Sequence, residues 1–397
     1  MEKLSNRLKK LSDSQTLVMT QKSRELKNKG FDVINLSIGE PDFNTPDPVK
    51  EAAKIAIDNN FTHYSPVAGF ADLLAVISTK FKKENNLDYK PNQIVVSNGA
   101  KQSIVNILMC IINDDDEVII PKPYWVSYPE MVKLAGGKPV YLDSSIQTDF
   151  KLDPKQLEEK INDKTKAIIF NSPSNPTGSV YSQTELKAIA DILAKNKNVY
   201  IISDEIYEHI NFCGKHESIA QFPEIKERVI VVNGVSKAFA MTGWRIGYIG
   251  APQWIAKECI KLQGQITSGA SSIAQKAALA AISSDEPFSK IMCQEFLVRR
   301  DNVLKLLNEI PGVKCNVPEG AFYVFPNISS YFNKSFGKYK ISNSEDLSMY
   351  ILETVYVGIV PGSAFGNENC VRISYAVKNE KLVEAISRIK TALAKLK

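Results

Sequence analysis

Apolar positions in the middle of the chain form two kinds of run, short continuous ones and longer amphipathic ones. Six short runs predict strands, at residues 93–97, 117–121, 139–142, 167–170, 199–204 and 229–232. Between most of them apolar residues recur at helical spacing, which predicts helices at residues 101–112, 124–134, 154–161 and 182–194. Strands that are apolar throughout and separated by helices predict an α/β fold with a mostly parallel sheet covered on both faces.

The two ends of the chain show different patterns. Residues 5–29 predict one polar helix ended by Gly30, followed by an extended run at 31–38. Beyond residue 286 the pattern predicts a long helix at 288–309, short strands at 320–326 and 370–374, and a last helix at 379–396. A chain of 397 residues exceeds what one hydrophobic core usually supports. We therefore expect a large domain at 48–286 and a small α+β domain at 287–397, joined by an N-terminal segment at 1–47.

Composition narrows the classes of protein. Hydrophobic residues make up 44% and charged residues 23%, and the net charge of +5 is too small to indicate a nucleic-acid partner. The cysteines are scattered without a CxxC or Cys/His cluster, which predicts neither a zinc site nor disulfides, but reduced, mostly buried thiols. Residues 1–10 lack the apolar core of a signal peptide, and the apolar stretch at 107–112 is too short to cross a membrane. We expect a cytoplasmic protein without a resident metal.

Residues that could bind a ligand or take part in catalysis follow four of the predicted strands. Asn98 and Gly99 follow one, residues 171–178 another, Asp204 ends a third, and Ser236 with Lys237 follows a fourth. Ligands of parallel sheets bind beyond the carboxyl ends of the strands. The sequence therefore predicts one crevice to which all four strand ends contribute.

Lys237 lies among small and apolar residues, with Ser236 before it and Arg245 eight positions later. Apolar surroundings disfavour the ammonium form, so this amine would be a better nucleophile and would form a Schiff base with a carbonyl compound or pyridoxal phosphate. Ser236 and Arg245 offer a hydroxyl and a guanidinium suited to a phosphate. The alternative is a surface lysine beside a helix, with an arginine that pairs with a carboxylate.

Two charged residues occupy apolar strands. Asp204 either keeps a pyridine nitrogen protonated or caps a following helix, and Tyr207 comes three residues later. Arg372 either grips a substrate carboxylate or faces outward from its strand. The local pattern leaves both pairs of alternatives open.

Three further stretches have weaker signals. Asn175 lies in a segment with two prolines and a glycine, which indicates either an ordered loop with a directed amide or a plain turn. Residues 97–102 lead from a strand into a helix, where small residues let backbone N–H groups approach a phosphate, although the Walker spacing is absent. Trp125 would stack on a planar ring or pack in the core.

Together these stretches resemble the class I pyridoxal-phosphate-dependent aminotransferases of fold type I, and among them the Ib subgroup of bacterial aspartate aminotransferases. The motifs that carry the resemblance are GAKQ (99–102), PYW (123–125), NPTG (175–178), SDEIY (203–207), SKAFAMTGWRIG (236–247) and VRISYA (371–376). The resemblance implies a seven-stranded sheet in the large, cofactor-binding domain.

The resemblance also implies roles around the cofactor. Lys237 would bind pyridoxal phosphate covalently and move the substrate proton, and Asp204 would pair with the ring nitrogen. Tyr207 and Asn175 would hydrogen-bond the ring oxygen, and Trp125 would stack on the ring. The residues implied around the phosphate are Ala100, Lys101, Ser236 and Arg245.

Other implied roles concern the substrate and a second subunit. Gly39 and Arg372 match positions that bind the substrate's α-carboxylate, beside Trp125 and Asn175. Tyr64 matches a tyrosine that reaches the phosphate of the neighbouring subunit, which implies a homodimer with shared active sites.

The implied activity is a reversible ping-pong transfer of the amino group from L-aspartate to 2-oxoglutarate, giving oxaloacetate and L-glutamate. Residues 263–275 contain no arginine for the distal carboxylate, and Lys101 resembles its substitute. A flexible ammonium discriminates less sharply than a guanidinium, so we expect broader acceptance that includes prephenate, with Arg7 and Thr16 also near the substrate. Alternatives are an aminotransferase that prefers alanine or aromatic substrates, a pyridoxal-phosphate β-lyase, and a non-catalytic sensor module.

Overall fold

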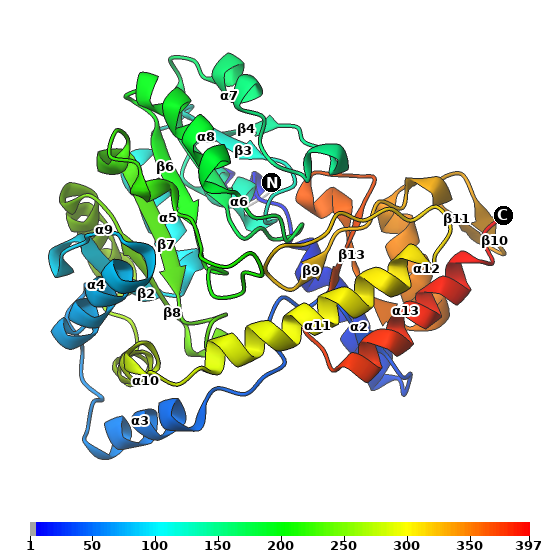
Figure 1. Ribbon diagram of the computed structural model, residues 1–397, viewed down its shortest axis with the longest axis horizontal. Coiled ribbons are helices and arrows are strands. Elements are labelled where there is room, and N and C mark those ends of the chain that lie inside the picture. The colour runs from blue at the N-terminus through cyan, green and yellow to red at the C-terminus, as the bar shows by residue number, and fades with distance from the viewer. Residues whose placement is uncertain (1–4) are drawn as a thin grey trace.

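The computed structural model describes residues 5–397 and is built around one seven-stranded sheet (Figure 1). The strand order is β2-β8-β7-β6-β5-β3-β4, and every neighbouring pair is parallel except those that β8 forms. The mostly parallel sheet is therefore confirmed. Its strands are β2 (Ile94–Asn98), β3 (Glu117–Pro121), β4 (Lys138–Leu142), β5 (Thr165–Asn171), β6 (Tyr200–Asp204), β7 (Val229–Gly234) and β8 (Ile246–Gly250).

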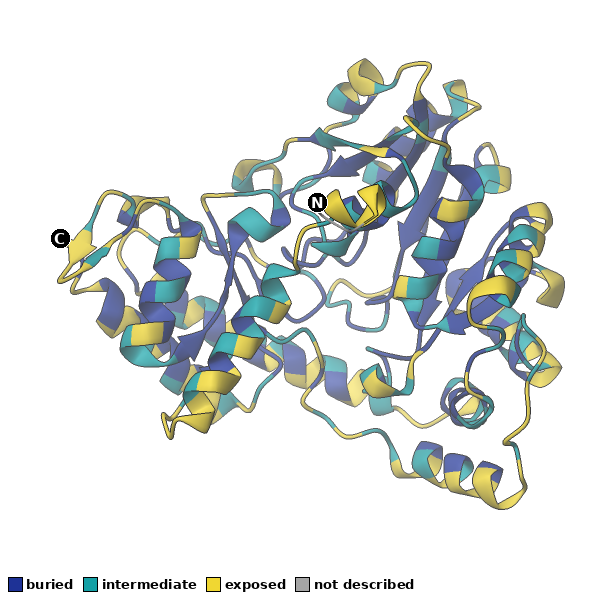
Figure 2. Ribbon diagram, turned by 180° about the vertical axis from the view of Figure 1, so that it is seen from behind, coloured by how far each residue is buried: buried dark blue, intermediate teal, exposed yellow. Residues whose placement is uncertain are grey.

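The sheet is buried on both faces, as continuous apolar strands require (Figure 2). Alternate residues of one strand enter different hydrophobic clusters: Ile201 packs on one face and Ile202 on the other. The first face is covered by α4 (Ala71–Asn85), α7 (Pro154–Lys160), α8 (Gln183–Lys195) and α10 (Ser272–Ser283). The second is covered by α5 (Ala100–Ile111), α6 (Ser127–Leu134) and α9 (Gln253–Ile266).

Strand β8 is absent from the strands predicted by the apolar pattern. It follows the Lys237 segment directly and runs antiparallel between β2 and β7. Its glycines mask the apolar signal, and Gly247 is required there because a Cβ would lie 2.1 Å from the backbone nitrogen of Ala100. This close approach holds the start of α5 against the sheet.

The C-terminal elements form a separate hydrophobic cluster around α11 (Phe288–Asn308), α12 (Ser344–Val355) and α13 (Asn379–Leu393). Ile34 and Leu36 from the N-terminal part pack in the same cluster. In Figure 1 α11 extends from beside the sheet toward α12 and α13. The domain boundaries at residues 47 and 286 remain a prediction. The short strands of this part are β1 (Ile34–Asn35), β9 (Tyr323–Val324), β10 (Ser335–Phe336), β11 (Tyr339–Lys340), β12 (Val357–Gly358), β13 (Val360–Pro361) and β14 (Val371–Ser374).

The single helix expected at residues 5–29 is wrong. Two helices occur instead, α1 (Asn6–Lys9) and α2 (Gln15–Asn28), and Ser14 precedes the second in an extended conformation. Serine and aspartate at 12–14 favour such breaks because their side chains compete for backbone hydrogen bonds. Gly30 ends α2 as predicted, with a φ of +92°. Residues 1–4, which begin the segment without a signal-peptide core, lie outside the described residues.

Other predicted boundaries shift by a few residues. The helix expected from 124 begins at Ser127, because residues 122–126 form a loop that carries Trp125. The strand expected at 320–326 shortens to β9. Five segments of the described chain without a specific prediction are α-helical: α3 (Asp47–Asp58), α4, α9, α10 and α12.

The structure tests the predictions about the cysteines and about membrane-spanning segments. All six cysteines are free, although Cys259 and Cys370 alone are buried and Cys213 is exposed, so the expectation of mostly buried thiols is wrong. Within residues 5–397, no helix has the length and apolar character needed to cross a membrane.

Candidate active site

A cavity of about 390 Å³ opens at the carboxyl ends of β2, β5, β6 and β7. It is the crevice that the strand ends predict. Most of the residues singled out in the sequence line it: Gly39, Ala100, Lys101, Trp125, Asn175, Asp204, Tyr207, Ser236, Lys237, Arg245 and Arg372, together with Thr16.

Lys237 lies in the turn after β7 and extends into the cavity. Its Nζ donates to the carbonyl oxygen of Gly39 at 2.6 Å and lies 5.9 Å from the ring centroid of Tyr207. Burial lowers the pKa of Lys237 to about 8, and Arg245 and Arg372 act in the same direction. The geometry rules out the alternative of a surface lysine, and the lowered pKa makes the neutral amine more accessible near neutral pH than that of an ordinary lysine.

Asp204 ends β6 and is only 3% exposed. Its Oδ2 accepts a hydrogen bond from the hydroxyl of Tyr128 at 2.7 Å, and its Oδ1 accepts from the backbone nitrogen of Ile206 at 3.3 Å. Burial raises the pKa of Asp204 to about 6, although the Tyr128 hydrogen bond acts in the opposite direction. Turns rather than a helix follow within the described chain, so the helix-cap alternative is wrong.

Arg372 lies on β14 and is 2% exposed, so the alternative of an outward-facing arginine is also wrong. Its guanidinium donates to Asn175 Oδ1 at 2.9 Å and to the carbonyl oxygen of Ser37 at 2.6 Å, and it packs on the ring of Tyr323. Its Nε is buried without a hydrogen-bond partner among the described residues. A buried cation with an unused donor is costly unless an anion completes the site.

The start of α5 and Arg245 form a cradle. Gly99 precedes the helix with a φ of +82°, and a Cβ there would lie 2.2 Å from an Arg245 nitrogen. The first N–H groups of a helix have no intrahelical partner, and Gly99 offers no capping side chain. Arg245 donates to the carbonyl oxygens of Thr242 and Asn98, at 2.7 and 3.4 Å. Free N–H groups beside a guanidinium suit a phosphate.

The aromatic residues and Lys101 form the rest of the wall. Trp125 is half-buried and meets the ring of Tyr128 edge to face. The ammonium of Lys101 lies 5.0 Å from the centroid of the Trp125 ring, and burial, followed by Arg245, lowers the pKa of Lys101. The hydroxyls of Tyr207 and Tyr323 are 2.9 Å apart. The side-chain nitrogen of Asn175 has no partner among the described residues, which leaves a donor facing the cavity.

The turn that carries Asp204 and Tyr207 toward the cavity is held from behind by two carboxylates. Glu205 accepts hydrogen bonds from Ser203 and Ser218 at 2.9 and 2.6 Å, and lies 3.0 Å from the ring nitrogen of His216. Burial opposes the charged form of His216, but Glu205 outweighs it and raises the pKa of His216.

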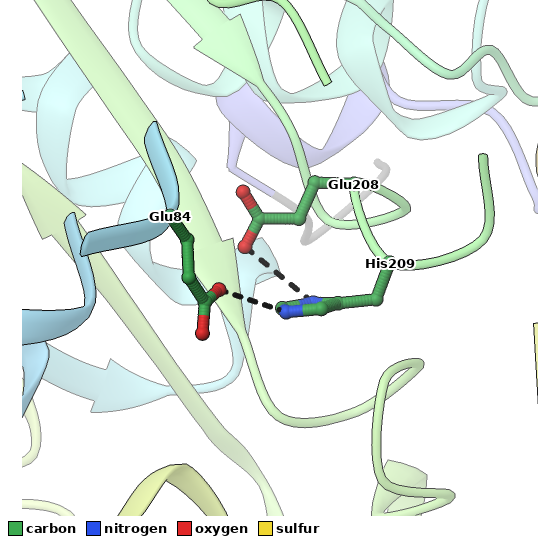
Figure 3. Close-up of side chains that lie close together, drawn as sticks. All are labelled: Glu84, Glu208 and His209. Atoms are coloured by element: carbon green, nitrogen blue, oxygen red, sulfur yellow. Dashed lines mark hydrogen bonds and ion pairs between the residues drawn. The ribbon is translucent and has the colours of Figure 1, made fainter. Parts of the chain in front are cut away.

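Glu208 is the second of these carboxylates and pairs with the ammonium of Lys80 from α4; both side chains are 3% exposed. Asn85 donates to its other oxygen at 2.6 Å. Figure 3 shows His209 between Glu208 and Glu84, with its two ring nitrogens 3.5 and 3.0 Å from their oxygens. Burial alone would raise the pKa of Glu208, but Lys80 outweighs it and lowers that pKa.

Comparison with known proteins identifies the family. Residues 32–389 match the model of the family "Aminotransferase class I and II". The chain belongs to this family. It is 48% identical to the bifunctional aspartate aminotransferase and glutamate/aspartate-prephenate aminotransferase of Petunia hybrida, over 99% of this chain and 83% of that protein. It is 45% identical to the aspartate aminotransferase of Bacillus subtilis, over 99% of both chains.

Solved structures agree with the fold. The aspartate aminotransferase from Rhizobium meliloti superposes with a TM-score of 0.96 at 40% identity, over 100% of both chains. The chain is therefore a pyridoxal-phosphate-dependent aminotransferase of fold type I, as the sequence motifs predicted. This excludes the non-catalytic sensor module.

The residues of the cavity fit pyridoxal phosphate. The cradle at Gly99 and Arg245 matches a phosphate, Lys237 matches an aldehyde, and the buried carboxylate of Asp204 lacks the cation that a protonated ring nitrogen would supply. At the other end of the cavity, Arg372 Nε has no hydrogen-bond partner among the described residues, and a substrate carboxylate would supply one. The individual roles of these residues remain proposals.

Two predicted site residues lie apart from the cavity. Tyr64 is 96% exposed and lines a separate hollow with residues 269–273. Arg7 is exposed on α1 and is absent from the cavity wall.

Sequence reasoning missed Tyr128 and Arg24, which both line the cavity. Tyr128 is three residues beyond Trp125, at the start of α6, and the two rings meet edge to face. Arg24 lies on α2. The sequence pattern predicted one long polar helix there and did not indicate which of its faces meets the site.

Replacing Glu208 with alanine should strongly destabilise the protein. Lys80 would keep a buried charge without its main partner, and breaking such a pair costs about 3–5 kcal/mol. Urea denaturation should show this loss. Glu51, which forms an exposed pair with Lys54, provides the matched control, because Glu51→Ala should cost less than about 1 kcal/mol. Equal effects of the two substitutions would contradict a stabilising role for the buried network.

The raised pKa of Asp204 predicts a pH-dependent stability of the cofactor-free protein. The folded chain keeps the proton up to about pH 6, whereas an unfolded aspartate loses it near 3.8, so stability falls as pH rises through that window. Asp204→Asn keeps an acceptor for Tyr128 and removes the fall, so it should stabilise the cofactor-free protein at pH 8 by up to about 3 kcal/mol. The difference should vanish near pH 4.

Urea denaturation of both proteins across pH 4–8 measures this effect. Asp58→Asn, at an exposed position at the end of α3, is the control and should follow the wild type at every pH. A constant difference between Asp204→Asn and the wild type across the range would refute the linkage.

Proposed function

We propose that this aminotransferase transfers the amino group of L-aspartate to 2-oxoglutarate, giving oxaloacetate and L-glutamate in a reversible ping-pong reaction. The observation that carries the proposal is the cavity itself, where Lys237, Asp204 and Arg372 converge and Lys101 adds a cation at the wall. Similar proteins are named aspartate aminotransferases or aspartate/prephenate aminotransferases, which supports aspartate and extends the proposal to prephenate.

When bound, pyridoxal phosphate supplies an aldehyde that receives the amino group and a ring that takes up the electrons of the broken Cα–H bond. Arg245, Ser236 and the start of α5 would hold the phosphate, and Asp204 would keep the ring nitrogen protonated. Trp125 would cover a ring face, and the free amide nitrogen of Asn175 would donate to the ring oxygen beside Tyr207.

The substrate would be oriented by Arg372, whose unused Nε and charge suit the α-carboxylate, next to Gly39. This orientation would direct the Cα–H bond toward Lys237. An amine with a pKa of about 8 both accepts and returns a proton readily near neutral pH. Lys237 would thus serve as the base and acid that moves the proton from Cα.

The assembly is part of the proposal. We infer a homodimer, because Tyr64 is almost fully exposed although the resemblance assigns it to the phosphate of a neighbouring subunit. An exposed aromatic side chain beside a hollow is typical of a contact surface. The free thiols are consistent with the cytoplasm as its location.

Mixing the cofactor-loaded protein with one amino acid at a time tests the proposal directly. Aspartate and glutamate should quickly convert the aldehyde absorbance into that of the amine form, and alanine should do so slowly. The absence of a cofactor band would contradict the whole proposal. Faster conversion with alanine or an aromatic amino acid would favour an aminotransferase of that preference, and release of ammonia, sulfide and pyruvate from cysteine would favour a β-lyase.

Lys101→Ala should lower kcat/KM for aspartate about tenfold, because a charge-assisted contact to the distal carboxylate is lost. The loss should be smaller with alanine, which has no distal carboxylate. Lys257→Ala removes the same charge from the exposed face of α9 and serves as the control. Unchanged aspartate kinetics in Lys101→Ala would show that Lys101 does not bind this group.

A further inference from the structure

One face of α2 forms part of the cavity wall. Thr16, Thr20 and Arg24 recur every four residues, the spacing that aligns side chains on one side of a helix, and all three line the cavity. The hydroxyl of Thr20 lies 3.1 Å from that of Ser37, whose carbonyl oxygen accepts from Arg372. A chain of contacts therefore fixes this face of α2 beside the proposed α-carboxylate site.

The cavity wall carries an excess of positive charge. Its cations are Arg24, Lys101, Lys237, Arg245 and Arg372, against the carboxylates of Glu40 and Asp204. Such an excess favours ligands with several negative charges. A phosphate and one α-carboxylate account for Arg245 and Arg372, and Lys237 is the amine of the reaction.

Arg24 differs from the other four cations because its side chain has no partner in the part of the chain that the structure describes. Arg372 and Arg245 donate to carbonyl oxygens, Lys237 donates to Gly39, and Lys101 lies on the face of Trp125. No hydrogen bond or ion pair of the Arg24 side chain is found within residues 5–397. Its guanidinium is free to meet a ligand.

We infer that Arg24 is a specificity-determining residue that binds the distal carboxylate of a dicarboxylic substrate together with Lys101. The inference rests on the proposed function and names a second cation for it. A guanidinium stays charged throughout the physiological pH range and can bind both oxygens of a carboxylate, which a lysine cannot match in geometry. Arg24 is exposed, so its flexible side chain would also suit acids longer than aspartate.

Binding of two matched four-carbon acids tests the inference without relying on turnover. Calorimetry with the cofactor-loaded protein compares succinate, which has two carboxylates, with butyrate, which has one. Arg24→Ala should weaken succinate binding about tenfold, the loss expected for one charge-assisted contact, and butyrate binding much less. Arg24→Lys should keep part of the affinity. Lys27→Ala, which removes a charge from α2 outside the cavity wall, should bind succinate like the wild type.

Kinetics supply a second readout. In the half-reaction, the ratio of kcat/KM for aspartate to that for alanine should fall about tenfold in Arg24→Ala, mainly through KM. Wild-type affinity for succinate in a folded Arg24→Ala protein would overturn the inference, as would equal losses for succinate and butyrate. If Arg24→Ala does not fold, Arg24→Gln decides, because it removes the charge and keeps most of the side chain: a wild-type preference for succinate over butyrate in that variant overturns the inference. Failure of the proposed function is distinguishable, because the wild type itself would then fail to convert aspartate.

Discussion

The contact between the Asp204 carboxylate and the Tyr128 hydroxyl, at the end of β6, is the interaction on which the cavity depends. A carboxylate with 3% exposure is costly in the cofactor-free protein, and two hydrogen bonds from neutral donors, Tyr128 and the Ile206 backbone, offset only part of that cost. The carboxylate is therefore kept where a cationic ring nitrogen would stabilise it far more than water could. In the proposed role of Asp204, stability of the free chain and affinity for the cofactor would oppose each other at this position.

A costly group at a fixed position needs a rigid support, and the turn after β6 has one. Its front presents Asp204 and Tyr207 to the cavity, whereas Glu205 and Glu208 are bonded behind it. Because both carboxylates are fully paired in the interior, the turn cannot shift without leaving a buried charge unsatisfied. Removing one partner of this network is costly, so the network fixes the direction of two site residues.

The sequence pattern predicted the sheet and the crevice because both follow from local rules. Continuous apolar strands forced a parallel sheet, and the carboxyl ends of such strands meet at one edge, so Asn175, Asp204 and Lys237 converged as expected. The pattern failed at β8, where glycines required by the approach to Ala100 hide the strand. It also failed for Tyr128 and Arg24, because their role depends on which helix face meets the cavity, and this is set by tertiary packing. The alternatives for Asp204 and Arg372 needed burial to be known, which no local spacing provides.

The distribution of charge explains how one cavity can serve a cofactor and two different acids. The cations near the strand ends are held by backbone carbonyls, as Arg245 and Arg372 are, so their positions are fixed before any ligand arrives. Lys101, which lies on an aromatic ring, and Arg24, which has no hydrogen-bond or ion-pair partner among residues 5–397, are exposed and less tightly held. Fixed charges suit the phosphate and α-carboxylate that every substrate complex shares, whereas movable charges suit a distal carboxylate whose distance changes between aspartate and glutamate. The proposed ping-pong reaction would require both acids to bind in one site, and an arrangement with a rigid end and an adaptable end would meet that requirement without a second pocket.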